Sequence, residues 1–211
     1  MNRRVCRTKP GSSRMIVGDP SIFAIESGIM QAYEELSLRA LGFFVIHVLG
    51  RSYGYKKPDA THLAIAYDGV LRRIESRGNH QAPIVIDAPA PEIAIAIGRE
   101  NYIGPEENEL FFGMTADRFG HSLYSNGHVW APDGEQGFDD GSSVLQFEAA
   151  NRVRLVAFQR EDYSYIPESL RDLWLPADDF YDVLKEWRVR FEAEWEALPK
   201  EPAHVTVFPC R

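Results

Sequence analysis

The sequence predicts an α+β fold, in which a mainly antiparallel sheet is packed by amphipathic helices that include a long C-terminal helix. Three segments carry this prediction. Residues 41–49 form an apolar run typical of a buried strand, and residues 143–159 have the pattern of a β-hairpin. Residues 178–198 repeat apolar side chains at helical spacing. A chain of this length is expected to form one domain.

The N-terminal part is predicted to hold two strands followed by a helix. Residues 22–27 are predicted as the first strand. Residues 41–49 carry apolar side chains on both faces, so this strand is expected inside a sheet that is covered on both sides. His47, within that run, is expected to be a hydrogen-bonded core histidine. A helix is predicted over residues 59–77, capped at its start by Asp59.

In the rest of the chain, the secondary-structure pattern is clear in some segments and ambiguous in others. Residues 83–103 alternate isoleucines as a strand would, but their alanine content favours a helix. Residues 104–142 are rich in glycine, proline and acids, and long loops around one or two short elements are expected there. The C-terminal helix is predicted to bury one face, made of Phe180, Leu184, Trp187, Phe191, Trp195 and Leu198.

The composition disfavours several classes of protein. The 211 residues carry 23 basic and 31 acidic side chains, for a net charge of −8, and 45% of them are hydrophobic. These values are ordinary for a folded domain, and no apolar run approaches the ~20 residues of a membrane span. An acidic surface also disfavours nucleic acid and anionic membranes, because both attract cationic surfaces. We therefore expect neither as a partner.

Residues 1–14 differ from the remainder of the chain. They contain five basic residues and no acidic one, whereas a more structured pattern begins at Met15. We expect residues 1–14 to be a basic extension that is flexible or not native. Residues 15–211 are expected to form the single α+β domain. A functional basic tail is the alternative.

No cofactor or metal site is predicted. Cys6 and Cys210 belong to no CxxC or cysteine–histidine motif, so free thiols in a reducing cytoplasm are expected. The spacing between His121 and His128 fits neither a helical pair nor a short ligand motif. A small metal-dependent hydrolase that uses the loop from His121 to Asp140 remains the alternative function from the enzyme class.

Acidic residues gather in loops and on the outer face of the C-terminal helix. A solvated surface is the simplest explanation. The alternative is a surface that docks on a cationic protein, such as a nuclease, because opposite charge speeds association. Loops carry recognition more often than packed helices do. The predicted partner-binding residues are therefore Glu106, Glu107, Glu109, Asp133, Glu135, Asp139 and Asp140.

Several segments resemble the immunity protein 42 family of bacterial polymorphic toxin systems. They are GDPSIFAIE at residues 18–26, GFFVIHVLG at 42–50, GSSVLQF at 141–147, VRLVAF at 153–158 and FYxxLxxW at 180–187. The resemblance implies a cytoplasmic, non-catalytic immunity protein that binds and neutralises a cognate toxin. These segments are structural signatures, so no site residue is carried over from the family. A regulatory subunit that binds another partner remains the alternative within the binding class.

Overall fold

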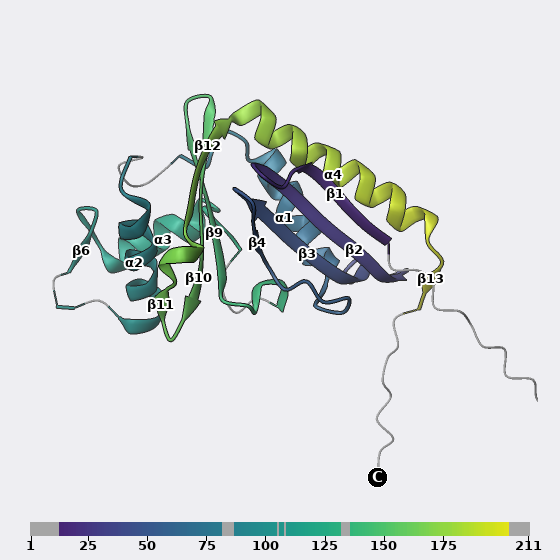
Figure 1. The fold of residues 1–211 in the computed structure, drawn as a ribbon, viewed down its shortest axis with the longest axis horizontal. Coiled ribbons are helices and arrows are strands. Elements are labelled where there is room, and N and C mark those ends of the chain that lie inside the picture. Colours follow the sequence, from purple (N-terminus) through teal and green to yellow (C-terminus); the bar gives the residue numbers. More distant parts are fainter. Residues whose placement is uncertain (1–12, 82–86, 105, 108, 132–135, 203–211) are drawn as a thin grey trace, which may run out of the picture.

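The computed structural model describes residues 13–81, 87–104, 106–107, 109–131 and 136–202. Within them, most strands belong to two sheets, and helices pack on both (Figure 1). The α+β prediction is confirmed, as is the long C-terminal helix, α4 (Ala177–Ala197). Cys6 and Cys210 lie outside the described residues.

The first sheet comes mainly from the N-terminal part of the chain. Its strand order is β1-β2-β3-β4, with β5 beside β3 and β13 parallel to β2. The strands are β1 (Ser13–Asp19), β2 (Phe23–Tyr33), β3 (Ala40–Val48), β4 (Arg51–Tyr53), β5 (Thr61–His62) and β13 (Lys200–Glu201). β3 lies between its neighbours and is buried on both faces, as its apolar pattern predicts.

The strand predicted at residues 22–27 is longer in the structure and has an unpredicted partner. β1 and β2 form an antiparallel hairpin across a turn that contains Pro20. β1 contains polar residues and a glycine, so its apolar residues form no regular pattern and the sequence does not indicate this strand. β1 also includes Ser13 and Arg14, two residues before the expected domain start at Met15.

Helices α1 (Leu63–Glu75) and α4 cover one face of the first sheet (Figure 1). Tyr67 of α1 meets Phe191 of α4 with ring centroids 5.7 Å apart, so the two helices also contact each other. The prediction that Asp59 caps α1 is wrong. The helix begins four residues later, because Thr61 and His62 pair with β3 before the chain coils.

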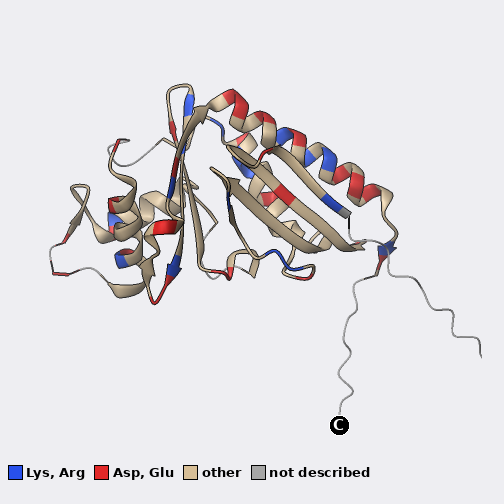
Figure 2. Ribbon diagram, in the orientation of Figure 1, with Lys and Arg blue, Asp and Glu red and all other residues tan. Residues whose placement is uncertain are grey.

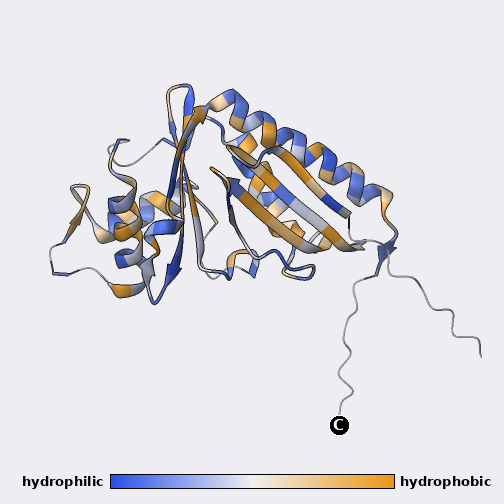
Figure 3. Cartoon of the chain, in the orientation of Figure 1, coloured by the Kyte–Doolittle hydropathy of each residue, from blue (hydrophilic) through white to orange (hydrophobic). Residues whose placement is uncertain are grey.

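The predicted buried face of α4 is confirmed. Phe180, Leu184, Trp187 and Phe191 are fully buried, while Trp195 and Leu198 pack against the core as partly buried side chains. Figure 3 shows the outer side of this helix as mainly hydrophilic and β3 as mainly hydrophobic. Because the apolar side chains of α4 lie on one side of the helix, they form the hydrophobic contact that holds α4 on the sheet.

The second sheet lies between two hydrophobic cores. It has the order β11-β10-β9-β8, and β12 pairs with the same edge of β10 as β11, opposite β9; β9 and β10 form the predicted hairpin. One face packs Val144 and Leu155 into the core shared with the first sheet. The other packs Phe147 and Phe158 against α2 and α3. The elements are β8 (Val129–Ala131), β9 (Ser142–Ala149), β10 (Arg152–Glu161), β11 (Ser164–Tyr165) and β12 (Arg171–Pro176).

Residues 83–142 contain more regular structure than expected. The preference for a helix is confirmed by α2 (Ala90–Gly98), which continues into a π-helical turn (Arg99–Ile103). The expectation of one or two short elements in residues 104–142 is wrong, because this stretch includes α3 (Ala116–Ser125) and β8 as well as a short hairpin. The hairpin strands are β6 (Leu110–Phe111) and β7 (Met114–Thr115). α3 is hard to predict because it buries only two large side chains, Phe119 and Leu123.

Among the described helices, none has both the length and the apolar character that crossing a membrane would require.

Candidate functional site

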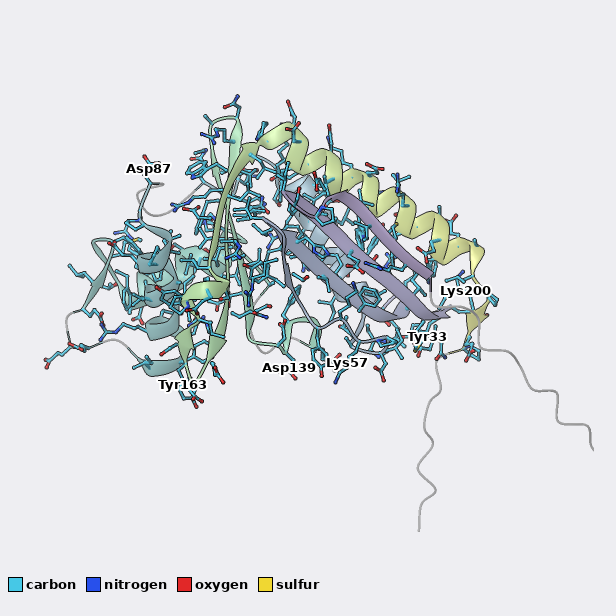
Figure 4. All side chains as sticks on the ribbon, viewed as in Figure 1. Tyr33, Lys57, Asp87, Asp139, Tyr163 and Lys200 are labelled. Carbon is cyan, nitrogen blue, oxygen red and sulfur yellow. The ribbon has the colours of Figure 1, made fainter. Side chains whose placement is uncertain are left out.

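Three exposed tyrosines gather where α2, α3 and the β10–β11 turn meet, and exposed Ile103 follows one of them in the chain. Tyr102, Ile103, Tyr124 and Tyr163 have exposed fractions of 38%, 62%, 50% and 64%. The rings of Tyr102 and Tyr163 lie 6.0 Å apart, and both tyrosines line a single hollow of about 310 Å³. We call these four residues the tyrosine patch. Tyr163 is labelled at its outer edge in Figure 4.

The π-helical turn after α2 presents two members of the patch. α2 is an alanine- and isoleucine-rich helix that packs on the second sheet, and its last residue is Gly98. A side chain at Gly98 would place its Cβ 2.5 Å from Nη1 of Arg160, so glycine permits the close approach of β10. The chain then widens into a π turn, a feature that occurs frequently at functional sites. This turn exposes Tyr102 and Ile103.

The β10–β11 turn holds Tyr163 in a strained backbone conformation. Pairing of Glu161 with Ser164 leaves Asp162 and Tyr163 as a two-residue loop. Their φ angles are 47° and 68°, in the left-handed region that favours glycine and asparagine. A bulky residue there costs of order 1 kcal/mol or more. Tyr163 occupies this position nevertheless, and its ring is mostly exposed at the tip of the hairpin.

Tyr124 reaches the patch from α3. Its hydroxyl donates a hydrogen bond to Oδ1 of Asn101 at 3.2 Å, which ties α3 to the π turn. A second hollow of about 260 Å³ lies between these elements and is lined by Tyr102, Tyr124 and Leu123. Tyrosines around shallow hollows are suited to protein recognition, because each ring offers a large rigid surface with one polar end.

Acidic residues lie beside the patch. Exposed Glu161 and Asp162 both precede Tyr163 in the turn, and half-buried Glu100 precedes Tyr102 by two residues. Burial, followed by the charge of Asp117, raises the pKa of Glu100. Figure 2 shows acidic residues at the tip of the β10–β11 turn. The exposed acids Glu161 and Asp162 therefore form an acidic border on the Tyr163 side of the patch, and the buried Arg160 lines the same hollow as Tyr163.

Two predicted binding residues, Glu106 and Glu109, belong to an ion-pair group beside the patch. Their carboxylates each lie 2.7 Å from the guanidinium of Arg99, at the start of the π turn. Glu109 also accepts the backbone N–H of Glu106 at 3.0 Å, so part of its role is to shape this loop. Glu107 is exposed.

The other predicted binding residues lie elsewhere. Asp139 is exposed and is labelled beside Lys57 in Figure 4. Asp140 is half-buried and accepts hydrogen bonds from the backbone of Gly54 and the side chain of Gln159, so it helps join the two sheets. Among the described residues no hydrogen bond or ion pair connects this pair with Glu106 or Glu109. Asp133 and Glu135 lie outside the described residues.

The two histidines considered for a metal-dependent hydrolase, His121 and His128, lie in different environments. His121 is exposed on α3. His128 is fully buried, and its Nδ1 donates to the carbonyl of Gln146 at 3.1 Å. In the part of the chain that the structure describes, no three His, Cys, Asp or Glu side chains form a group that could hold a metal ion. His47 is the hydrogen-bonded core histidine that the sequence predicts, with Nε2 2.9 Å from Glu26.

Comparison with known proteins gives two matches. The model of a family described as immunity protein 42 matches residues 15–190. The fold is similar to that of a CdiI from Burkholderia dolosa AUO158, with a TM-score of 0.51 and 16% sequence identity over 83% of this chain and 99% of that chain. No curated protein matches the sequence.

Proposed function

The chain belongs to the immunity protein 42 family, and we propose that it neutralises its cognate toxin by binding it through the tyrosine patch. In this proposal the protein acts by binding and not by catalysis. It covers the toxin's active site or holds the toxin in an inactive conformation. We place this event in the cytoplasm, where such a toxin would meet its target.

Tyr163 is the single observation that carries the choice of surface. Its ring is 64% exposed, and its backbone has a φ of 68°, where a glycine would cost less. A folded core gains nothing from this arrangement. A partner does gain, because tyrosines frequently contribute most of the binding energy of an interface. Strain at an exposed position is therefore an argument for a binding role.

Exposed apolar side chains on α2 and β6 extend the proposed surface. A stable protein interface buries about 1,600 Å² in total, with a well-packed apolar centre and a polar border. The tyrosine patch would supply the centre. Ile95 of α2 and Leu110 of β6 have exposed fractions of 49% and 60%. Both line a shallow hollow of about 340 Å³ between these two elements. Together they could form one side of such an interface.

The acidic border suggests the class of toxin. Glu161, Asp162 and Glu107 would attract a cationic surface and slow the approach of acidic proteins. A nuclease fits this description, because its cleft is built to hold phosphates. We propose a cationic toxin of this kind as the partner.

A growth-protection assay tests the proposal. The toxin encoded immediately upstream of this gene is expressed in cells with this chain or a variant of it. Wild type should restore growth, and the double variant Tyr102→Ala/Tyr124→Ala should protect poorly at equal protein levels. Leu36→Ala is the matched control, because Leu36 is 59% exposed but lies in the first sheet's β2–β3 connection. Equal protection by both variants would place the binding surface elsewhere.

A further inference from the structure

The hollow between the π turn and α3 has an apolar floor and an uncharged lining. Its volume is about 260 Å³, and none of its described lining residues carries a charge. The floor consists of Ile97, Leu123 and Leu145, which are only 3%, 1% and 1% exposed and belong to the core between the second sheet and α2 and α3. An ion placed there would lose its hydration without gaining a partner of opposite charge, so the lining favours an uncharged, apolar occupant.

The rim of this hollow belongs to the tyrosine patch. Tyr102, Tyr124 and Asn101 line the hollow and are exposed. The hydroxyl of Tyr124 donates to Oδ1 of Asn101, so this side of the rim is held together by a hydrogen bond. The hollow therefore opens within the surface that is proposed to meet the toxin.

One polar group lies among the apolar side chains of the floor. Ser143 of β9 lines the hollow and is 4% exposed. Side chains alternate along a strand, so Ser143 points to the same face of β9 as Leu145. Its neighbour Ser142 points to the opposite face, where its hydroxyl accepts the backbone N–H of Gly54 at 3.1 Å.

The hydroxyl of Ser143 has no hydrogen-bond partner among the described residues. It is also not one of the polar atoms that the fold seals away without a partner, so its oxygen remains accessible from the hollow. Water can satisfy this hydroxyl in the free protein. A group that displaces the water must supply a donor or an acceptor in its place, because a buried unpaired hydroxyl is costly.

The volume of the hollow suits a single aromatic side chain. A protein cavity of about 150 Å³ holds benzene, so 260 Å³ has room for a substituted ring. Tyrosine rings such as those at the rim pack well against another aromatic ring, edge-on or offset. A phenylalanine would fill the space but would leave Ser143 unpaired. A tyrosine carries the same ring and ends in a hydroxyl that can donate to a serine or accept from it.

We propose that this hollow receives the side chain of one tyrosine of the toxin, with its ring against Leu123 and Leu145 and its hydroxyl hydrogen-bonded to Ser143. This assignment rests on the proposed function and gives the tyrosine patch a defined anchor. Residues that dominate the energy of an interface are typically aromatic side chains held in such well-packed pockets.

Small probes test the hollow without the toxin. The full chain is titrated with 4-methylphenol and with toluene, which reproduce the side chains of tyrosine and phenylalanine, and methyl NMR signals of Leu123 and Leu145 report binding. Both signals should shift saturably with 4-methylphenol. Ser143→Ala removes only the hydroxyl, so it should weaken 4-methylphenol binding about fivefold and leave toluene binding unchanged. Ser164→Ala is the matched control, because Ser164 is exposed and does not line the hollow.

Calorimetry with the purified toxin then tests the occupant. The toxin should bind Ser143→Ala about fivefold more weakly than wild type, and 4-methylphenol should compete with it. Failure of 4-methylphenol to bind saturably, an equal loss of toluene binding in Ser143→Ala, or toxin binding that neither the variant nor the probe changes would each overturn the assignment. The proposed function fails by a different result, namely full growth protection by Tyr102→Ala/Tyr124→Ala.

Discussion

The indole nitrogen of Trp187 donates a hydrogen bond to the hydroxyl of Ser27 at 3.0 Å, and this contact joins α4 to β2 inside the core. Trp187 is fully buried. It stacks on Phe191 with ring centroids 5.1 Å apart and meets Phe44 edge-on at 5.2 Å. The single polar atom of the side chain is therefore satisfied while its rings fill the space between helix and sheet.

Trp187→Ala is expected to lower the free energy of unfolding by roughly 3–5 kcal/mol, because it leaves a large cavity and an unpaired Ser27. Chemical denaturation measures this loss. Val189→Ala is the matched control on the same helix, since Val189 is 63% exposed, and it should change stability by less than about 0.5 kcal/mol. Small and equal losses for both variants would contradict the packing of α4 described above.

The elements that the sequence predicts best are those whose apolar pattern is strong and local. β3, the β9–β10 hairpin and α4 each bury a regular series of side chains, so the pattern alone indicates them. The pattern does not indicate β1 and α3, because few of their side chains face a core. The start of α1 was misplaced because pairing of β5 with β3 is a tertiary contact.

The candidate site was beyond sequence analysis for a different reason. Tyr102, Tyr124 and Tyr163 come from three distant segments and meet only after folding. Exposed tyrosines carry no periodic signal. The acidic clusters were visible in the sequence, but the internal partners of Glu106, Glu109 and Asp140 were not.

The N-terminal residues provide a second prediction. The sequence predicts that residues 1–14 are dispensable for folding, whereas the structure places Ser13 and Arg14 in β1. Arg14 pairs with the buried Glu26 at 2.6 Å, but its side chain is 57% exposed, so the pair contributes less than about 1 kcal/mol. Glu26 keeps Lys56 and His47 as partners. In thermal melts, a chain that begins at Met15 should lie within about 4 °C of one that begins at Ser13. A larger loss would show that Arg14 is essential to the cluster around Glu26.

Buried His128 makes stability depend on pH. Burial lowers the pKa of this ring from 6.5 to about 4, so below pH 6.5 the unfolded chain binds a proton that the folded chain excludes. Stability is therefore complete above pH 6.5 and falls as the pH drops toward 4. Between pH 7 and pH 5 this residue should account for about 2 kcal/mol of lost stability.

Urea denaturation of wild type and His128→Gln at both pH values measures this contribution. The variant is expected to be less stable at pH 7 because it disturbs a packed site. Its further loss on going to pH 5 should nevertheless be smaller than that of wild type. An equal pH-dependent loss in both proteins would show that His128 is not the responsible group.

The acidic border of the patch is expected to act on the association rate with the toxin. The double variant Glu161→Gln/Asp162→Asn keeps both side-chain sizes, and asparagine tolerates the left-handed backbone at position 162. Stopped-flow association with the toxin should be several-fold slower than for wild type at low salt. The difference should disappear as salt shortens the Debye length from ~30 Å at 0.01 M to ~10 Å at 0.1 M.

Neutralising an acid away from the patch provides the comparison. Glu75→Gln changes an exposed acid of α1 and should leave the association rate near that of wild type. Asp139→Asn tests the second predicted cluster in the same way. A larger effect from Asp139→Asn than from the patch variant would move the electrostatic contact to that cluster.

We expect the exposed ring of Tyr163 to bind the toxin at a cost to folding, and the variant Tyr163→Gly separates these two effects. Glycine accepts a φ of 68° without strain, so the variant should be as stable as wild type or more stable. Its affinity for the purified toxin, measured by calorimetry, should fall at least about tenfold, as expected when a central tyrosine is removed from an interface. Unchanged affinity in a fully folded Tyr163→Gly protein would show that this ring does not bind the toxin.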